Sequence, residues 1–99
     1  MRGTGRTART LQRALDLAAH GNAVLIVAHS ANYARQLERR IAPNSNVRFC
    51  SVHDRNAFIG RAGYALIDNG VYENRDSYDA FYCLIKDHLL DRMNLEYAE

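Results

Sequence analysis

The start of the chain holds residue types that bind phosphate. Gly3, Gly5, Arg6 and Thr7 stand directly before a helical pattern. The first backbone N–H groups of a helix point towards an anion and carry partial positive charge, and arginine adds a forked donor. This segment therefore predicts an anion- or nucleotide-binding site.

Arginines recur along the same segment. Arg6, Arg9 and Arg13 (the arginine row) are spaced three and four residues apart and would share one side of a helix. Cations near a helix N-terminus oppose its dipole, which favours an anionic partner. The arginine row can therefore bind nucleic-acid phosphates or an acidic protein. Alternatively, it is the solvent-exposed face of the helix.

Two polar groups follow apolar runs. His29 and Ser30 come directly after the run 23–28, at a strand end where open α/β sheets place ligand groups, although Ser30 is also a good helix cap. Asp68 ends a later apolar run and can serve a ligand or simply start a turn. Both alternatives stay open for each group.

The cysteines are weaker candidates. Cys50 and His53 suggest a nucleophile pair or metal ligands, but residues three apart in a strand face opposite sides, and no second ligand pair follows. We therefore expect no metal site. Cys83 falls within an apolar helical pattern and is expected in the core. Two cysteines also fit a reduced, cytoplasmic protein better than a disulfide-linked one.

The hydrophobic pattern positions these residues on a small α/β domain. Strands are expected at about 23–28, 47–52 and 64–68, and main helices at about 6–20, 30–41 and 76–93. The first strand is continuously apolar, as in a parallel sheet that is covered on both faces. The alternation of helices and strands predicts a single three-layer sandwich with a mainly parallel sheet over residues 1–99.

The last expected helix has a wide apolar face. Its inward residues are expected to be Tyr78, Phe81, Tyr82, Ile85, Leu89 and Met93. Because tyrosine is favoured at interfaces and a 99-residue domain has a small core, we also expect a homodimer. The dimer interface would include Tyr78, Tyr82, Leu89 and Met93, together with an exposed edge of the sheet.

Charge is divided unevenly along the chain. Residues 1–50 contain eight arginines against two acids, a net charge of +6, whereas residues 51–99 contain five cations against nine acids, a net charge of −4. This asymmetry predicts an anionic partner or a contact between basic and acidic surfaces of two subunits, although codon bias also explains an excess of arginine. No apolar run suits a membrane span or a signal peptide, so no membrane partner is expected.

Four short segments occur in the order and spacing of a known family. Gly5-Arg6-Thr7 resembles the end of a G-x-x-x-x-G-K-[ST] loop, and residues 24–30 resemble a strand that ends in a motif contacting nucleic acid. Residues 47–53 resemble a strand that ends in Ser and His, and residues 65–69 resemble the acidic strand of the family. Together they resemble the first half of a P-loop NTPase core of the helicase or RecA type, over roughly residues 3–70. The resemblance implies a nucleotide with Mg²⁺, held by Thr7 and oriented through Asp68.

Departures from the family pattern argue against hydrolysis. Arg6 replaces the lysine that contacts the β- and γ-phosphates, and Asn69 replaces the glutamate that activates water. The strand that would position the loop is missing before Gly3. We therefore expect a degenerate scaffold without a cofactor, and phosphate or a nucleotide with Mg²⁺ is the alternative.

The expected function is that of a non-catalytic, cytoplasmic binding or regulatory protein. It would act as a homodimer on a host or viral protein, which by analogy suits a small phage accessory protein. A nucleic-acid-binding module that uses the arginine row is one alternative. Residual nucleotide binding or hydrolysis is the other.

Overall fold

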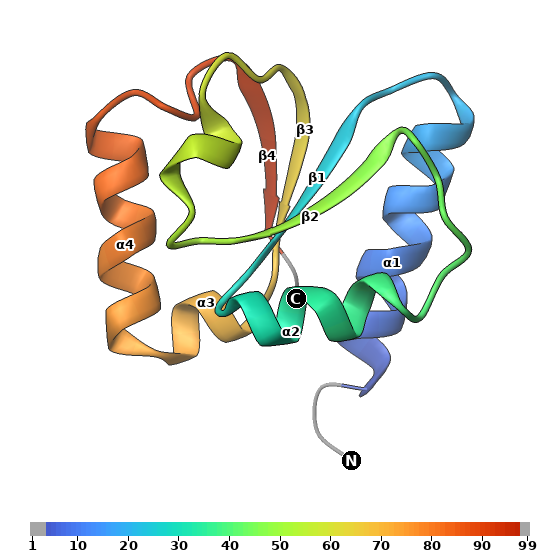
Figure 1. Ribbon diagram of the computed structural model, residues 1–99, viewed down its shortest axis with the longest axis horizontal. Helices are drawn as coiled ribbons and strands as arrows, with labels where there is room; N and C mark the ends of the chain where they lie inside the picture. Colours follow the sequence, from blue (N-terminus) through green and yellow to red (C-terminus); the bar gives the residue numbers. More distant parts are fainter. Residues whose placement is uncertain (1–3, 98–99) are drawn as a thin grey trace.

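The computed structural model of the chain describes residues 4–97, and the side chains from residue 7 onwards. The elements are α1 (Thr4–Ala19), β1 (Val24–Ala28), α2 (Ala31–Glu38), β2 (Val47–Ser51), the 3₁₀ helix η1 (Arg55–Phe58), β3 (Gly63–Ile67), α3 (Gly70–Glu73), α4 (Arg75–Lys86) and β4 (Met93–Tyr97) (Figure 1). All strands are parallel, in the order β2-β1-β3-β4. The predicted α/β fold with a parallel sheet is confirmed, and its three predicted strands lie within a residue of their expected positions. None of the described helices is long and apolar enough to cross a membrane.

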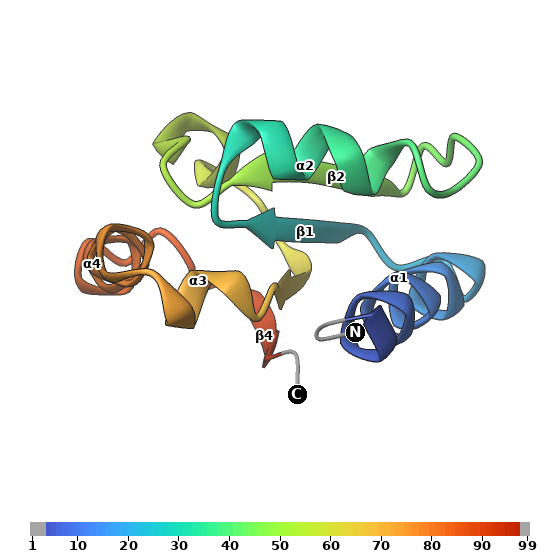
Figure 2. The same cartoon turned by 90° about the horizontal axis from the view of Figure 1, so that it is seen from below.

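Helices cover both faces of the sheet because side chains alternate along each strand. On one face, Leu25, Val27 and Ile67 pack with residues of η1 and α3 and with Phe81 and Leu84 of α4. On the opposite face, the alternate residues of β1 pack with α1 and α2. Figure 2 shows α1 and α4 on opposite sides of the strands.

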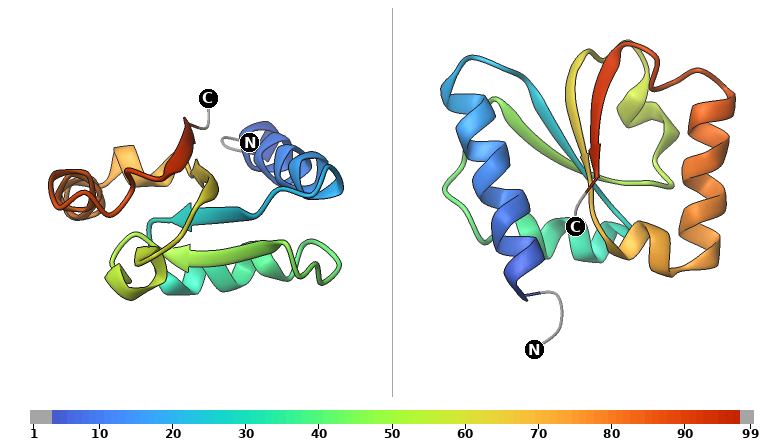
Figure 3. Two further views of the ribbon diagram at one scale, coloured as in Figure 1. Left: turned by 90° about the horizontal axis from the view of Figure 1, so that it is seen from above. Right: turned by 180° about the vertical axis from the view of Figure 1, so that it is seen from behind.

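The prediction for the C-terminal region was wrong in one respect, because the last helix ends at Lys86 and 93–97 form a fourth strand. His88 has a φ of 62°, a left-handed conformation that stops the helix. Met93 and Leu95 of the new strand join the same core cluster at a spacing of two. Seen from behind, β4 lies between α1 and α4 (Figure 3).

The buried face of α4 also differs from the prediction. Ser77, Phe81 and Leu84 are its buried residues, at spacings of four and three. Ser77 occupies a core position because its hydroxyl donates a hydrogen bond to the backbone oxygen of His29 (3.2 Å). A polar residue therefore shares the buried face of the helix with Phe81 and Leu84.

This orientation of α4 turns several expected core residues outwards. Tyr78, Tyr82 and Ile85 are 50%, 58% and 40% exposed, and we call these three residues the α4 apolar face. Cys83 is exposed as well, so its expected place in the core was wrong. An α4 apolar face on the surface makes this helix a better interface candidate than the sequence pattern indicated.

Candidate functional site

The strand order creates a switch point at the carboxyl edge of the sheet. The chain leaves β1 towards β2 on one side, whereas it leaves β3 towards β4 on the other. His29 follows β1 and Asp68 follows β3, so the sheet brings the two predicted polar groups to neighbouring positions. Open α/β sheets bind ligands at such a point. The start of α1 lies at the same edge, at the bottom of Figure 1.

Asp68 is almost completely buried, at 5% exposure. Its Oδ2 accepts a hydrogen bond from the backbone N–H of Gly70 (3.0 Å), and its own N–H donates to the backbone oxygen of Val27 (2.9 Å). Burial raises the pKa of this carboxyl group, while the N–H of Gly70 and the nearby His29 oppose the rise. Asp68 therefore ends β3 in the manner of a turn-forming acid whose oxygen already has a protein partner.

His29 fills the space next to this carboxylate. A Cβ atom added at Gly70 would lie 2.7 Å from His29 Nδ1 and 3.1 Å from Asp68 Oδ2, so both groups crowd the same glycine. The Nδ1 atom is buried and has no hydrogen-bond partner among the described residues. The ring of His29 also packs against the ring of Tyr33 in a tilted arrangement, with 4.9 Å between ring centroids.

Tyr33 connects this cluster to α1. Its hydroxyl lies 3.3 Å from Thr7 Oγ1, and Thr7 is only 7% exposed. A continuous series of contacts therefore joins Thr7 through Tyr33, His29 and Gly70 to Asp68, and we call these five residues the closed edge. Three of them, Thr7, His29 and Asp68, were predicted from the sequence as site residues, whereas Tyr33 and Gly70 were not, because they belong to ordinary helix and turn patterns.

Ser30 has the structural role that was one of its two alternatives. Its Oγ accepts a hydrogen bond from the backbone N–H of Tyr33 (3.1 Å), which caps α2. The hydroxyl is therefore already engaged by the first turn of that helix.

The predicted phosphate segment belongs to a helix. Gly5, Arg6 and Thr7 all lie in the first turns of α1, which begins at Thr4, whereas Gly3 and the side chain of Arg6 lie outside the described part of the chain. Within the arginine row, Arg9 is exposed. The structure thus gives this segment a helical start instead of a loop that wraps around phosphate.

Arg13 has an acidic partner in the last strand. Its Nε and one terminal nitrogen donate to the two carboxylate oxygens of Glu96, at 2.9 and 2.7 Å. This hydrogen-bonded pair raises the pKa of Arg13 and lowers that of Glu96. The bidentate contact fastens α1 to β4 and occupies one cation of the arginine row.

The four predicted interface residues separate into two groups. Tyr78 and Tyr82 are exposed on α4, as an interface requires. Leu89 is half-buried against the core, and Met93 is 8% exposed within β4, so neither lies on the α4 apolar face. Ile85, which was expected inside, takes their place beside the tyrosines.

The remaining chemical candidate is Cys50. It is buried, and burial raises the pKa of its thiol to about 12, with Asp54 adding to the rise and Arg61 opposing it. His53 is exposed and lies beyond the end of β2, whereas Cys50 is buried within the strand. In the described part of the chain, no three His, Cys, Asp or Glu side chains are grouped as metal ligands.

Comparison with known proteins identifies no relative: no protein-family model, curated protein or solved structure matches the chain.

Proposed function

We propose that this protein acts by binding a partner, on a P-loop-like scaffold whose nucleotide site is closed by its own side chains. The closed edge carries the proposal. Thr7 and Asp68, the residues that would hold and orient Mg²⁺, are both buried. The Thr7 hydroxyl contacts Tyr33, and the Asp68 carboxylate accepts the N–H of Gly70.

The chemistry at the end of β3 supports the same proposal. Asn69 cannot accept a proton from an attacking water, and its side-chain amide already donates to Glu73 (2.7 Å). Burial raises the pKa of Asp68, which opposes the charged form that a metal ion would need. These features favour a structural role for the residues that resemble a catalytic motif.

The test is thermal unfolding with ATP or GTP in the presence of Mg²⁺. A nucleotide at 100 times its Kd would add about 2.7 kcal/mol and raise the Tm of a domain of this size by roughly 10–20 °C. We expect no increase with either nucleotide. An increase that Asp68→Asn abolishes would contradict the proposal, provided that the exposed control Asp79→Asn retains it.

We propose a second copy of the chain as one partner, bound through the α4 apolar face. The observation that favours it is the exposure of three large apolar side chains at helical spacing on α4. A symmetric pair of such helices would cover Tyr78, Tyr82 and Ile85 of both protomers. The nucleic-acid alternative has less support, because Glu96 already neutralises Arg13.

Light scattering after size exclusion tests the dimer at about 100 μM protein, where a micromolar Kd gives a largely dimeric sample. We expect the wild-type mass to be that of a dimer, and Tyr82→Arg to give a monomer. The control is Ile59→Arg, because Ile59 is equally apolar and 62% exposed but lies outside α4. A monomeric wild type, or a dimer that survives Tyr82→Arg, would contradict this interface.

A further inference from the structure

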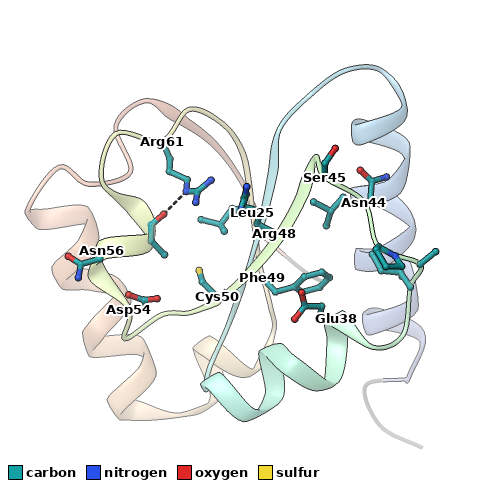
Figure 4. A pocket seen from close by; sticks show the side chains of 15 residues that line it. Leu25, Glu38, Asn44, Ser45, Arg48, Phe49, Cys50, Asp54, Asn56 and Arg61 are labelled. Atoms are coloured by element: carbon teal, nitrogen blue, oxygen red, sulfur yellow. Dashed lines mark hydrogen bonds between the residues drawn. The ribbon is translucent and has the colours of Figure 1, made fainter.

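A hollow of about 780 Å³ lies along β2, away from the closed edge (Figure 4). On one face of the sheet its lining includes Leu25, Arg48, Cys50, Ala57 and Arg61, and we call this part the β2 hollow. The volume of about 780 Å³ belongs to the whole hollow, which continues around the edge strand β2 to Phe49 on the opposite face of the sheet, so the β2 hollow is one part of it.

The β2 hollow exists because the connection from β2 to β3 contains no full helix. Its only helical part is η1, which has four residues. Arg48 pairs in register with Leu25 and precedes Cys50 by two residues, so these three side chains lie on the same face of the sheet. Leu25 and Cys50 are buried and form the apolar floor of the hollow, and the exposed Arg48 lines it on the same face.

Arg61 enters the hollow from the segment after η1. Its Nε donates a hydrogen bond to the backbone oxygen of Ala57 (2.7 Å), which fixes the guanidinium and leaves its terminal nitrogens available (Figure 4). A smaller hollow of about 60 Å³ is also lined by Leu25, Arg48 and Arg61. The two arginines therefore border the same space from β2 and from the segment before β3.

Neither arginine has an acidic partner in the part of the chain that the structure describes. Arg13 and Arg55, by contrast, pair with Glu96 and with an aspartate of the α4 C-terminus. A guanidinium is a planar fork that matches the oxygens of phosphate and carboxylate groups. Two unpaired forks beside an apolar floor are the combination that binds a small organic anion.

We propose that the β2 hollow binds a small organic anion, with its phosphate or carboxylate group between Arg48 and Arg61 and its apolar part on Leu25 and Ala57. Glu38 and Asp54 also line the larger hollow, and their charges repel additional anionic groups. The site therefore favours a ligand with one anionic group over a polyanion such as a nucleic acid or a nucleoside triphosphate.

Titrations followed by ¹H–¹⁵N NMR test this proposal, with phenyl phosphate, benzoate and inorganic phosphate as probes at up to about 10 mM, well above a millimolar Kd. We expect shifts concentrated in β2 and in 57–61, including the side-chain Nε–H signals of Arg48 and Arg61. The stronger of the two aromatic probes identifies the anionic group. Inorganic phosphate should bind more weakly than phenyl phosphate because it lacks an apolar part.

Variants separate the site from general charge attraction. Arg48→Gln and Arg61→Gln should each weaken binding by about tenfold or more, the loss expected for a charge-assisted hydrogen bond. The exposed control Arg40→Gln should change the affinity by less than about twofold. The exposed side chain of Arg48 makes no hydrogen bond or ion pair with the described residues, so its variant remains informative if Arg61→Gln loosens the segment after η1. Absence of shifts, shifts spread over the arginine row, or equal effects of the Arg48 and Arg40 variants would each overturn the proposal.

Discussion

Replacement of Gly70 by alanine tests the packing of the closed edge directly. The new Cβ would lie 2.7 Å from His29 Nδ1 and 3.1 Å from Asp68 Oδ2. His29 must then retreat by several tenths of an ångström to reach ordinary van der Waals distance, yet its ring is backed by Tyr33. The substitution therefore forces a rearrangement of the stacked rings.

The size of the effect follows from two opposing contributions. Overpacking of a dense site costs about 1–3 kcal/mol, whereas alanine gains up to about 1 kcal/mol over glycine in a helix such as α3. We expect Gly70→Ala to lower the free energy of unfolding by about 1–2 kcal/mol. In a domain of this size, that loss lowers the Tm by roughly 5–15 °C.

The assay is urea unfolding of a double-mutant cycle with His29→Ala. Once the ring of His29 is removed, the alanine at position 70 has space, so Gly70→Ala should become neutral or stabilising in that background. The coupling free energy between the two positions should be about 1–3 kcal/mol. Equal destabilisation with and without the His29 ring would refute the crowded arrangement, as would a neutral effect in the wild type.

Three further predictions concern the sheet and its ends. Gly63→Ala should lower the free energy of unfolding by more than about 3 kcal/mol, because its φ is 99° and the new Cβ would lie 2.5 Å from the backbone oxygen of Ala23. Gly21→Ala has a φ of 86° but open space around the new Cβ, so it should cost only about 1–2 kcal/mol. Thermal unfolding measures both losses, and similar values would contradict this ranking. The pKa of Asp68 is raised in the folded protein, so its contribution to stability is greatest in acid and falls as the pH rises through the folded pKa. Asp68→Asn should therefore be at least as stable as the wild type at pH 7. Urea titrations at several pH values should show that the variant has lost this pH dependence. The pKa of Glu96 is lowered, so its ion pair with Arg13 stabilises the folded protein above about pH 4.5 and is lost in acid. Glu96→Gln should lower the free energy of unfolding by about 0.5–1 kcal/mol at pH 7 and should make no difference near pH 2. A difference that persists in acid would exclude the ion pair as its cause.

The fold class could be predicted because its signals are local. The continuous apolar run of β1 specifies a strand that is buried on both faces, and Ser30 specifies the start of α2. Gly21, with a φ of 86°, ends α1 close to its expected position. Each of these features depends on neighbouring residues alone, so a single sequence contains them.

The C-terminal region shows where local patterns are insufficient. The buried face of α4 includes Ser77, whose hydroxyl donates a hydrogen bond to the backbone oxygen of His29 in a distant loop. The strand Met93–Tyr97 has a short alternating pattern that gains its identity only by pairing with β3. The apolar residues of both segments were visible in the sequence, but their partners were not.

The candidate site divides in the same way. The sequence by itself determined which residues carry charge and hydroxyl groups, and it placed His29 and Asp68 at strand ends. Only the tertiary structure decided that rings of Tyr33 and His29 connect Thr7 to Asp68, that Glu96 neutralises Arg13 across 83 residues, and that Arg48 and Arg61 share an open hollow. The physical reason is that periodicity reports which side of one element is buried, whereas the partner of a polar group is set by how distant elements pack.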